Sequence, residues 1–96
     1  MVNNQLKMTA KHIIFIGQVQ GVGFRFTAFR IANSYKLTGF VRNAPHGTVE
    51  MLAQGSPDDI ADCIRDIQDS FAGYIRETKT EEIPLNPQYT DFKVTF

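Results

Sequence analysis

The chain lacks tryptophan, has one cysteine and carries no formal net charge over its 96 residues. A single cysteine, Cys63, excludes a disulfide within the chain and cannot form a metal site by itself. Zero net charge argues against binding nucleic acid or a membrane surface through bulk charge. No apolar run approaches the ~20 residues that span a bilayer, and the polar start, Met1 to Lys11, lacks the apolar core of a signal peptide. We therefore expect a cytoplasmic protein without a membrane or nucleic-acid partner.

The apolar content is sufficient for one small core. Hydrophobic residues make up 43% of the sequence and include eight phenylalanines, as expected for one domain of this length. We expect residues 1–10 to form a flexible N-terminal tail and residues 11–96 to form the domain, as a free-standing monomer. Charge is unevenly distributed, because the first 50 residues hold six basic and one acidic residue and the rest hold four and nine. An anion site is therefore expected in the first half.

Hydrophobic spacing predicts an α+β domain. Periods of two and of 3.6 residues alternate along the chain. They predict strands at 11–19, 38–43, 48–54, 74–83 and 92–96, and helices at 23–35 and from Pro57 to about Phe71. The strand at 74–83 is mixed polar and is expected near a sheet edge. The order β-α-β-β-α-β is that of the ferredoxin-like split βαβ fold, an antiparallel-rich sheet with two helices on one face.

The two predicted helices begin differently. The second has Ser56 as N-cap, Pro57 at its first position and two aspartates in its first turn, so its own residues satisfy its free N–H groups. The first follows Gly21, Val22 and Gly23 and carries Arg25, a cation that costs ~0.3–1 kcal/mol at a positive helix end. Glycines here would let the amides converge on an anion. The pattern alone leaves two readings open, a phosphate site and a plain turn with a solvent-facing arginine.

Asn43 is the second candidate, at the end of the strand at 38–43. Its amide could hold a water molecule, although an asparagine before a turn more often bonds its own turn. The other polar candidates are weaker. His12 and His46 are expected on the surface and Cys63 in or beside the core. Phe24, Phe26 and Phe29 are expected to pack in the core.

Two segments resemble the signatures of the acylphosphatase family. Gly17-Gln18-Val19-Gln20-Gly21-Val22-Gly23-Phe24-Arg25 matches the pattern Gly-x-Val-Gln-Gly-Val-x-Phe-Arg. Gly39-Phe40-Val41-Arg42-Asn43-Ala44-Pro45-His46-Gly47 matches the second signature, a strand ending in Asn with Gly four positions later. The chain departs from the family at His46, where an acidic residue is usual, and at Phe71-Ala72-Gly73, where Gly-Pro or Ser-Pro is usual.

The resemblance implies a function and a site. It implies hydrolysis of a carboxyl–phosphate anhydride, a small-molecule acyl phosphate, to carboxylate and inorganic phosphate by in-line attack of water. It implies that Arg25 binds the phosphate together with the loop formed by Gln20, Gly21, Val22, Gly23 and Phe24, and that Asn43 positions the attacking water. It implies no metal, no cofactor and no covalent intermediate.

Two other functional classes remain open. One is an acylphosphatase-like module that binds phosphate or carbamoyl phosphate without turnover, or that contacts another protein. The other is an RNA-binding ferredoxin-like domain, which would need basic and aromatic residues interleaved on the open sheet face. The strands at 11–19 and 48–54 carry mainly Ile, Val, Met and Glu50 there, which disfavours RNA.

Overall fold

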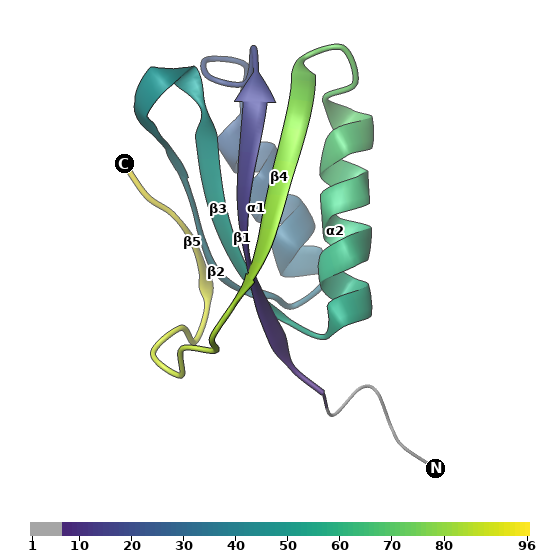
Figure 1. Cartoon of the computed structure of the whole chain (residues 1–96), viewed down its shortest axis with the longest axis vertical. Helices are drawn as coiled ribbons and strands as arrows, with labels where there is room; N and C mark the ends of the chain where they lie inside the picture. Colours follow the sequence, from purple (N-terminus) through teal and green to yellow (C-terminus); the bar gives the residue numbers. More distant parts are fainter. Residues whose placement is uncertain (1–6) are drawn as a thin grey trace.

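The computed structural model describes residues 7–96 and consists of a five-stranded sheet and two α-helices (Figure 1). The first six residues of the expected tail lie outside the described residues. The elements, in chain order, are β1 (Thr9–Gly17), α1 (Phe24–Ser34), β2 (Thr38–Asn43), the 3₁₀ turn η2 (Pro45–Gly47), β3 (Val49–Gly55), α2 (Pro57–Ser70), β4 (Ile75–Ile83) and β5 (Phe92–Val94).

The sheet has the strand order β4-β1-β3-β2-β5. The pairs β1–β3, β1–β4 and β2–β3 are antiparallel, and β5 runs parallel to β2. Figure 1 shows α1 and α2 on the same face of the sheet, with β4 at one edge and β5 at the other. This arrangement confirms the ferredoxin-like α+β fold and the edge position of β4. None of the helices in residues 7–96 is long and apolar enough to cross a membrane.

The core between the sheet and the helices contains a stack of three phenylalanines. The ring centroids of Phe15 and Phe24 are 5.0 Å apart, and those of Phe24 and Phe71 are 4.5 Å apart. Cys63 is fully buried in the same core, and its burial raises the pKa of the thiol to about 12. Cys63 therefore packs as a small apolar residue, as predicted. Because Phe24 is the first residue of α1, these contacts attach the start of that helix to the core.

β1 lies two residues earlier than the sequence predicted, at Thr9–Gly17 rather than 11–19. Thr9 and Ala10, placed in the expected tail, pair with Gly55 and Gln54 of β3. At the other end a register shift follows Ile16, and Gly17 has φ 141° with the carbonyl oxygen of Tyr74 2.1 Å from where a Cβ would lie. The strand ends at this close approach, which only glycine permits.

Candidate active site

The loop from β1 to α1 ends in two left-handed glycines. Gly21 has φ 79°, and Gly23, the N-cap of α1, has φ 75° and ψ 17°. A Cβ at either position would meet no atom within 4 Å. The need for glycine is therefore conformational rather than steric.

The N–H groups at the start of α1 are left free. The first hydrogen bond of the helix runs from Thr27 N to Gly23 O, at 3.2 Å. The N–H groups of residues 20–26 have no hydrogen-bond partner in residues 7–96. In contrast, Ser56 Oγ accepts from Asp59 N at 3.2 Å and two aspartates stand in the first turn of α2. The start of α1 thus has the free donors and positive end that bind anions.

Arg25 is held beside these amides by the end of the chain. Its Nη1 donates to the carbonyl oxygen of Thr95 at 3.2 Å, and its Cζ lies 4.6 Å from the ring centroid of Phe96. It forms no ion pair with another residue of the described chain. A guanidinium has five N–H donors, so most remain available and its charge is not neutralised by a carboxylate.

A pocket of about 180 Å³ brings the two sequence motifs together. The pocket is lined by the glycine loop, the start of α1 and the last residue of β2. The lining residues are Val19, Gly21, Gly23, Phe24, Arg25, Phe26 and Asn43. The volume is more than ten times the ~10–15 Å³ that one water molecule requires. There is therefore room for a group of several atoms next to the guanidinium and the free amides.

Asn43 is the last residue of β2 and lines this pocket. Its side-chain amide has no hydrogen-bond partner among residues 7–96, so it does not bond its own turn as the local pattern favoured. Other groups close that turn: Ala44 N donates to Thr48 O at 2.8 Å, and Thr48 Oγ1 donates to Pro45 O at 3.0 Å. The Asn43 amide is therefore available to hydrogen-bond a molecule in the pocket.

Gln20 and Val22, two of the predicted phosphate-binding residues, do not line the pocket. Val22 is 39% exposed. The Gln20 side-chain amide donates to the carbonyl oxygens of Ala44 and Thr48, at 3.0 and 2.8 Å. Gln20 therefore ties the glycine loop to the turn after Asn43, while its backbone N–H stays free. The other predicted members of the cradle, Gly21, Gly23 and Phe24, do line the pocket with Arg25.

Phe26 is at the mouth of the pocket rather than in the core. It is 62% exposed and lines the pocket, whereas Phe24 is 2% exposed. The expectation that these residues pack in the core is confirmed for Phe24 and was wrong for Phe26. The helical period indicates this difference, because side chains two residues apart point about 200° apart around the helix axis. Thr95 and Phe96 were missed for a different reason, since no local pattern indicates a contact with Arg25.

A polar cluster on the other sheet face is separate from the pocket. Glu50 Oε2 lies 2.6 Å from His12 Nε2, and Arg42 Nε donates to Glu50 Oε1 at 2.6 Å. Val41 is fully buried under the helices, so its neighbour Arg42 points to the opposite face. Partial burial raises the pKa of Glu50, but the hydrogen bonds from His12 and Arg42 outweigh this effect and hold the pKa below its ordinary value. The cluster stabilises the sheet and does not contribute to the pocket.

His46, where the chain departs from the family pattern, is exposed in η2, as expected. It has the left-handed φ of 65°, a conformation in which histidine, asparagine and aspartate are enriched among non-glycine residues. The turn therefore accommodates His46 without displacing Asn43.

Comparison with known proteins gives a consistent result. The acylphosphatase family profile matches residues 11–94. An acylphosphatase of Chlorobaculum tepidum is 39% identical over 90 residues, covering 91% of this chain and 98% of that protein. The structure of an acylphosphatase from Coxiella burnetii superposes with a TM-score of 0.85 at 32% identity, covering 99% of this chain and 100% of that one. The HypF protein of T. kodakarensis contains a similar unit (TM-score 0.79, 31% identity), in which 92% of this chain matches 12% of the longer one.

Proposed function

The chain belongs to the acylphosphatase family, and we propose that the pocket between Arg25 and Asn43 is where it hydrolyses its acyl phosphate. Acylphosphatase activity itself follows from a family match over nearly the whole chain and from relatives of the same length. The observation that supports this location is the pocket itself, which joins a guanidinium without a carboxylate partner, free helix amides and an unbonded Asn43 amide.

Arg25 and the amides of residues 20–26 bind the phosphate group in this proposal. Arginine offers paired N–H donors whose spacing fits two oxygens of a phosphate. The loop amides and the positive end of α1 contact the remaining oxygens. These donors also stabilise the charge on the phosphoryl group as the reaction proceeds, which is the main electrostatic contribution in phosphoryl transfer.

Asn43 orients the attacking water from the end of β2. Its side-chain carbonyl oxygen can accept a hydrogen bond from the water molecule. The water oxygen forms a bond to phosphorus while the bond from phosphorus to the acyl oxygen breaks, and the carboxylate leaves with that electron pair. The water proton passes to a phosphate oxygen of the substrate. Because a carboxylate is a good leaving group, this step needs no Asp, Glu or His as a general acid.

Oxygen isotope labelling tests the proposed reaction. Benzoyl phosphate hydrolysed in ¹⁸O-water should give labelled inorganic phosphate and unlabelled benzoate, because the water attacks phosphorus. Label in the benzoate would refute attack at phosphorus. A non-catalytic phosphate- or carbamoyl-phosphate-binding module, the alternative that the sequence left open, would bind phosphate and release none from benzoyl phosphate. The cytoplasmic location and the monomeric state stay predictions.

A further inference from the structure

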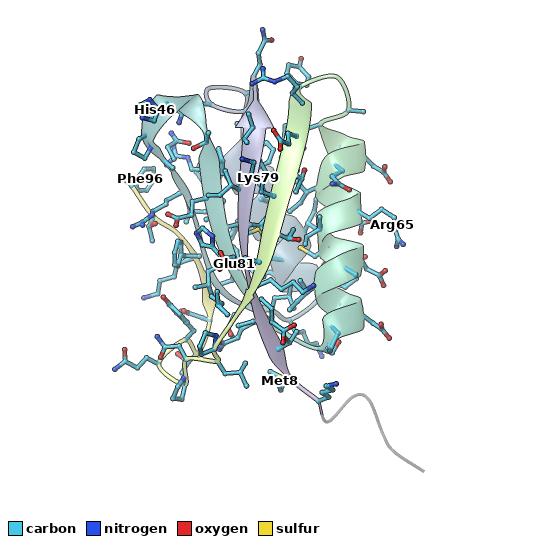
Figure 2. All side chains as sticks on the ribbon, in the orientation of Figure 1. Met8, His46, Arg65, Lys79, Glu81 and Phe96 are labelled. Atoms are coloured by element: carbon cyan, nitrogen blue, oxygen red, sulfur yellow. The ribbon has the colours of Figure 1, made fainter. Side chains whose placement is uncertain are left out.

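A second cavity lies where β2, β5 and the loop between β4 and β5 meet. Its volume of about 330 Å³ is within the range of sites that bind small organic ligands, ~300–1,000 Å³. Figure 2 shows the loop at the lower left of the sheet, whereas His46, in the turn after Asn43, is at the upper left. The cavity shares no lining residue with the pocket of Arg25 and Asn43. A ligand bound here would therefore be separate from the proposed reaction.

The part of the cavity formed by the sheet combines an aromatic ring with a cation. Phe40 and Lys93 are opposite each other in the parallel pairing of β2 with β5. Their neighbours Val41 and Phe92 are buried under the helices, so Phe40 and Lys93 point to the other face of the sheet. Lys93 is exposed and forms no ion pair within residues 7–96. Its charge is available to an anionic group of a ligand.

The loop before β5 adds a second ring, from Tyr89. The ring centroids of Tyr89 and Phe40 are 6.1 Å apart, and the two ring planes are 53° apart. Rings at this spacing are already in contact, so a planar group packs against the pair rather than between its members. β1 and β3 present no Phe or Tyr on this face, since Phe15 of β1 is buried in the core. The surface therefore has one place for a base and not the several that a bound RNA strand uses.

Hydrogen bonds hold this loop on the sheet on both sides of Tyr89. Gln54 Oε1 accepts from Asn86 N at 2.6 Å, and Gln54 Nε2 donates to Asn86 O at 3.0 Å. Gly39 N donates to Asp91 O at 2.8 Å. The cavity is thus formed without a ligand, and binding requires little further ordering of the chain.

We propose that this cavity binds a nucleotide, with the base against Tyr89 and Phe40 and the phosphate on Lys93. Aromatic side chains bind bases by stacking, and a lysine binds a phosphate as a point charge. Gln88 and Asp91 also line the cavity, and their side chains can hydrogen-bond the edge of a base, because an amide donates and accepts and a carboxylate accepts from an amino group. An aromatic acid without ring amino groups offers no donor to Asp91.

NMR titration of the ¹⁵N-labelled protein with AMP, adenosine and ribose 5-phosphate tests the site. AMP should shift the amide signals of residues 39–40 and 88–93 with a dissociation constant of about 0.1–1 mM, as suits a small open cavity. Adenosine lacks the phosphate and should bind about two- to fivefold more weakly, the effect of one exposed charge pair. Ribose 5-phosphate lacks the base and should leave these signals unchanged up to about 5 mM.

Two matched pairs of variants assign the contacts. Tyr89→Leu removes the ring and should weaken AMP binding about fivefold or more, because stacking on an aromatic side chain contributes at least that factor. Tyr89→Phe keeps the ring and should bind as wild type. Lys93→Gln should bind AMP as weakly as wild type binds adenosine, and Lys93→Arg should not. All four variants should hydrolyse benzoyl phosphate at the wild-type rate, since neither residue lines the other pocket.

Three results would overturn the inference. AMP shifts confined to residues 20–26 would place the nucleotide in the Arg25 pocket instead. Equal shifts of residues 88–93 by AMP and by ribose 5-phosphate would reduce the site to a phosphate contact. Equal AMP affinities of Tyr89→Leu and Tyr89→Phe would exclude stacking. If Tyr89→Leu fails to fold, the Lys93 pair and the three ligands decide.

Discussion

Replacing Arg25 by lysine should disable the enzyme even though the positive charge is kept. The pocket presents the guanidinium with one N–H bound to Thr95 O and the others free. Lysine has a single ammonium and cannot reproduce the paired donors. Losing one charge-assisted hydrogen bond costs ~1.5–3 kcal/mol, which corresponds to a loss of about 10- to 150-fold in kcat/KM. Arg25→Ala loses both bonds and the charge, so a loss of about 10²- to 10⁴-fold is expected by the same arithmetic.

The assay is phosphate release from benzoyl phosphate, with Arg30→Ala as the matched control. Arg30 is an exposed cation on the same helix that does not line the pocket, so its loss should leave kcat/KM within about twofold of wild type. Circular dichroism should show each variant folded, because Arg25 makes one hydrogen bond within the described chain. Arg25→Lys retaining at least half of the wild-type kcat/KM would refute the argument from fork geometry. Equal losses in Arg25→Ala and Arg30→Ala would refute the pocket as the site.

Three further predictions concern the pocket and the sheet. Asn43→Ala should lower kcat about 10²-fold, because the attacking water is no longer positioned. The inhibition constant of inorganic phosphate should be unchanged. An increase in that constant would mean that Asn43 binds phosphate instead. Phe26→Ala should raise KM for benzoyl phosphate more than KM for acetyl phosphate, because Phe26 is exposed at the pocket mouth. Equal changes in the two KM values would show that Phe26 does not contact the acyl group. Glu50 has a pKa below its ordinary value of 4.5, so the stability it contributes is present above pH 4.5 and is lost as the pH falls through the lowered pKa. Glu50→Gln should therefore flatten the fall in melting temperature at acid pH, and a fall as steep as that of wild type would contradict this assignment.

Local sequence signals were sufficient for those parts of the fold that local interactions determine. β2 has the predicted bounds, and α2 begins after the predicted cap, because turn and capping preferences act within a few residues. The ends of β1 were misplaced, since pairing with β3 and the close approach of Tyr74 decide them. These contacts involve residues far from β1 in the sequence, so a local sequence pattern cannot predict them.

The candidate site shows the same division between local and distant interactions. The glycines and Arg25 were identified because an uncapped, cationic helix start is unusual within its own segment. The bonds from Gln20 to Ala44 and Thr48, and from Arg25 to Thr95, join residues 24, 28 and 70 positions apart. Their existence depends on strand order and register, including the parallel pairing of a three-residue strand, β5. The sequence could therefore indicate the groups that we propose to bind the ligand, but not the contacts that those groups make with distant residues.

The two helix starts together indicate that the N-terminal end of α1 is less stable than it could be. A serine or aspartate N-cap stabilises a helix by roughly a few tenths of a kcal/mol relative to glycine, and it requires an extended backbone, as Ser56 has at φ −70° and ψ 147°. Gly23 has the left-handed conformation instead and makes no side-chain cap, while Arg25 adds ~0.3–1 kcal/mol of unfavourable interaction with the helix dipole. These terms amount to roughly 1 kcal/mol, to be compared with the ~5–15 kcal/mol that stabilises a typical domain. Because the same residues leave the amides free and keep the guanidinium unpaired, the lost stability and the capacity to bind an anion have one structural origin.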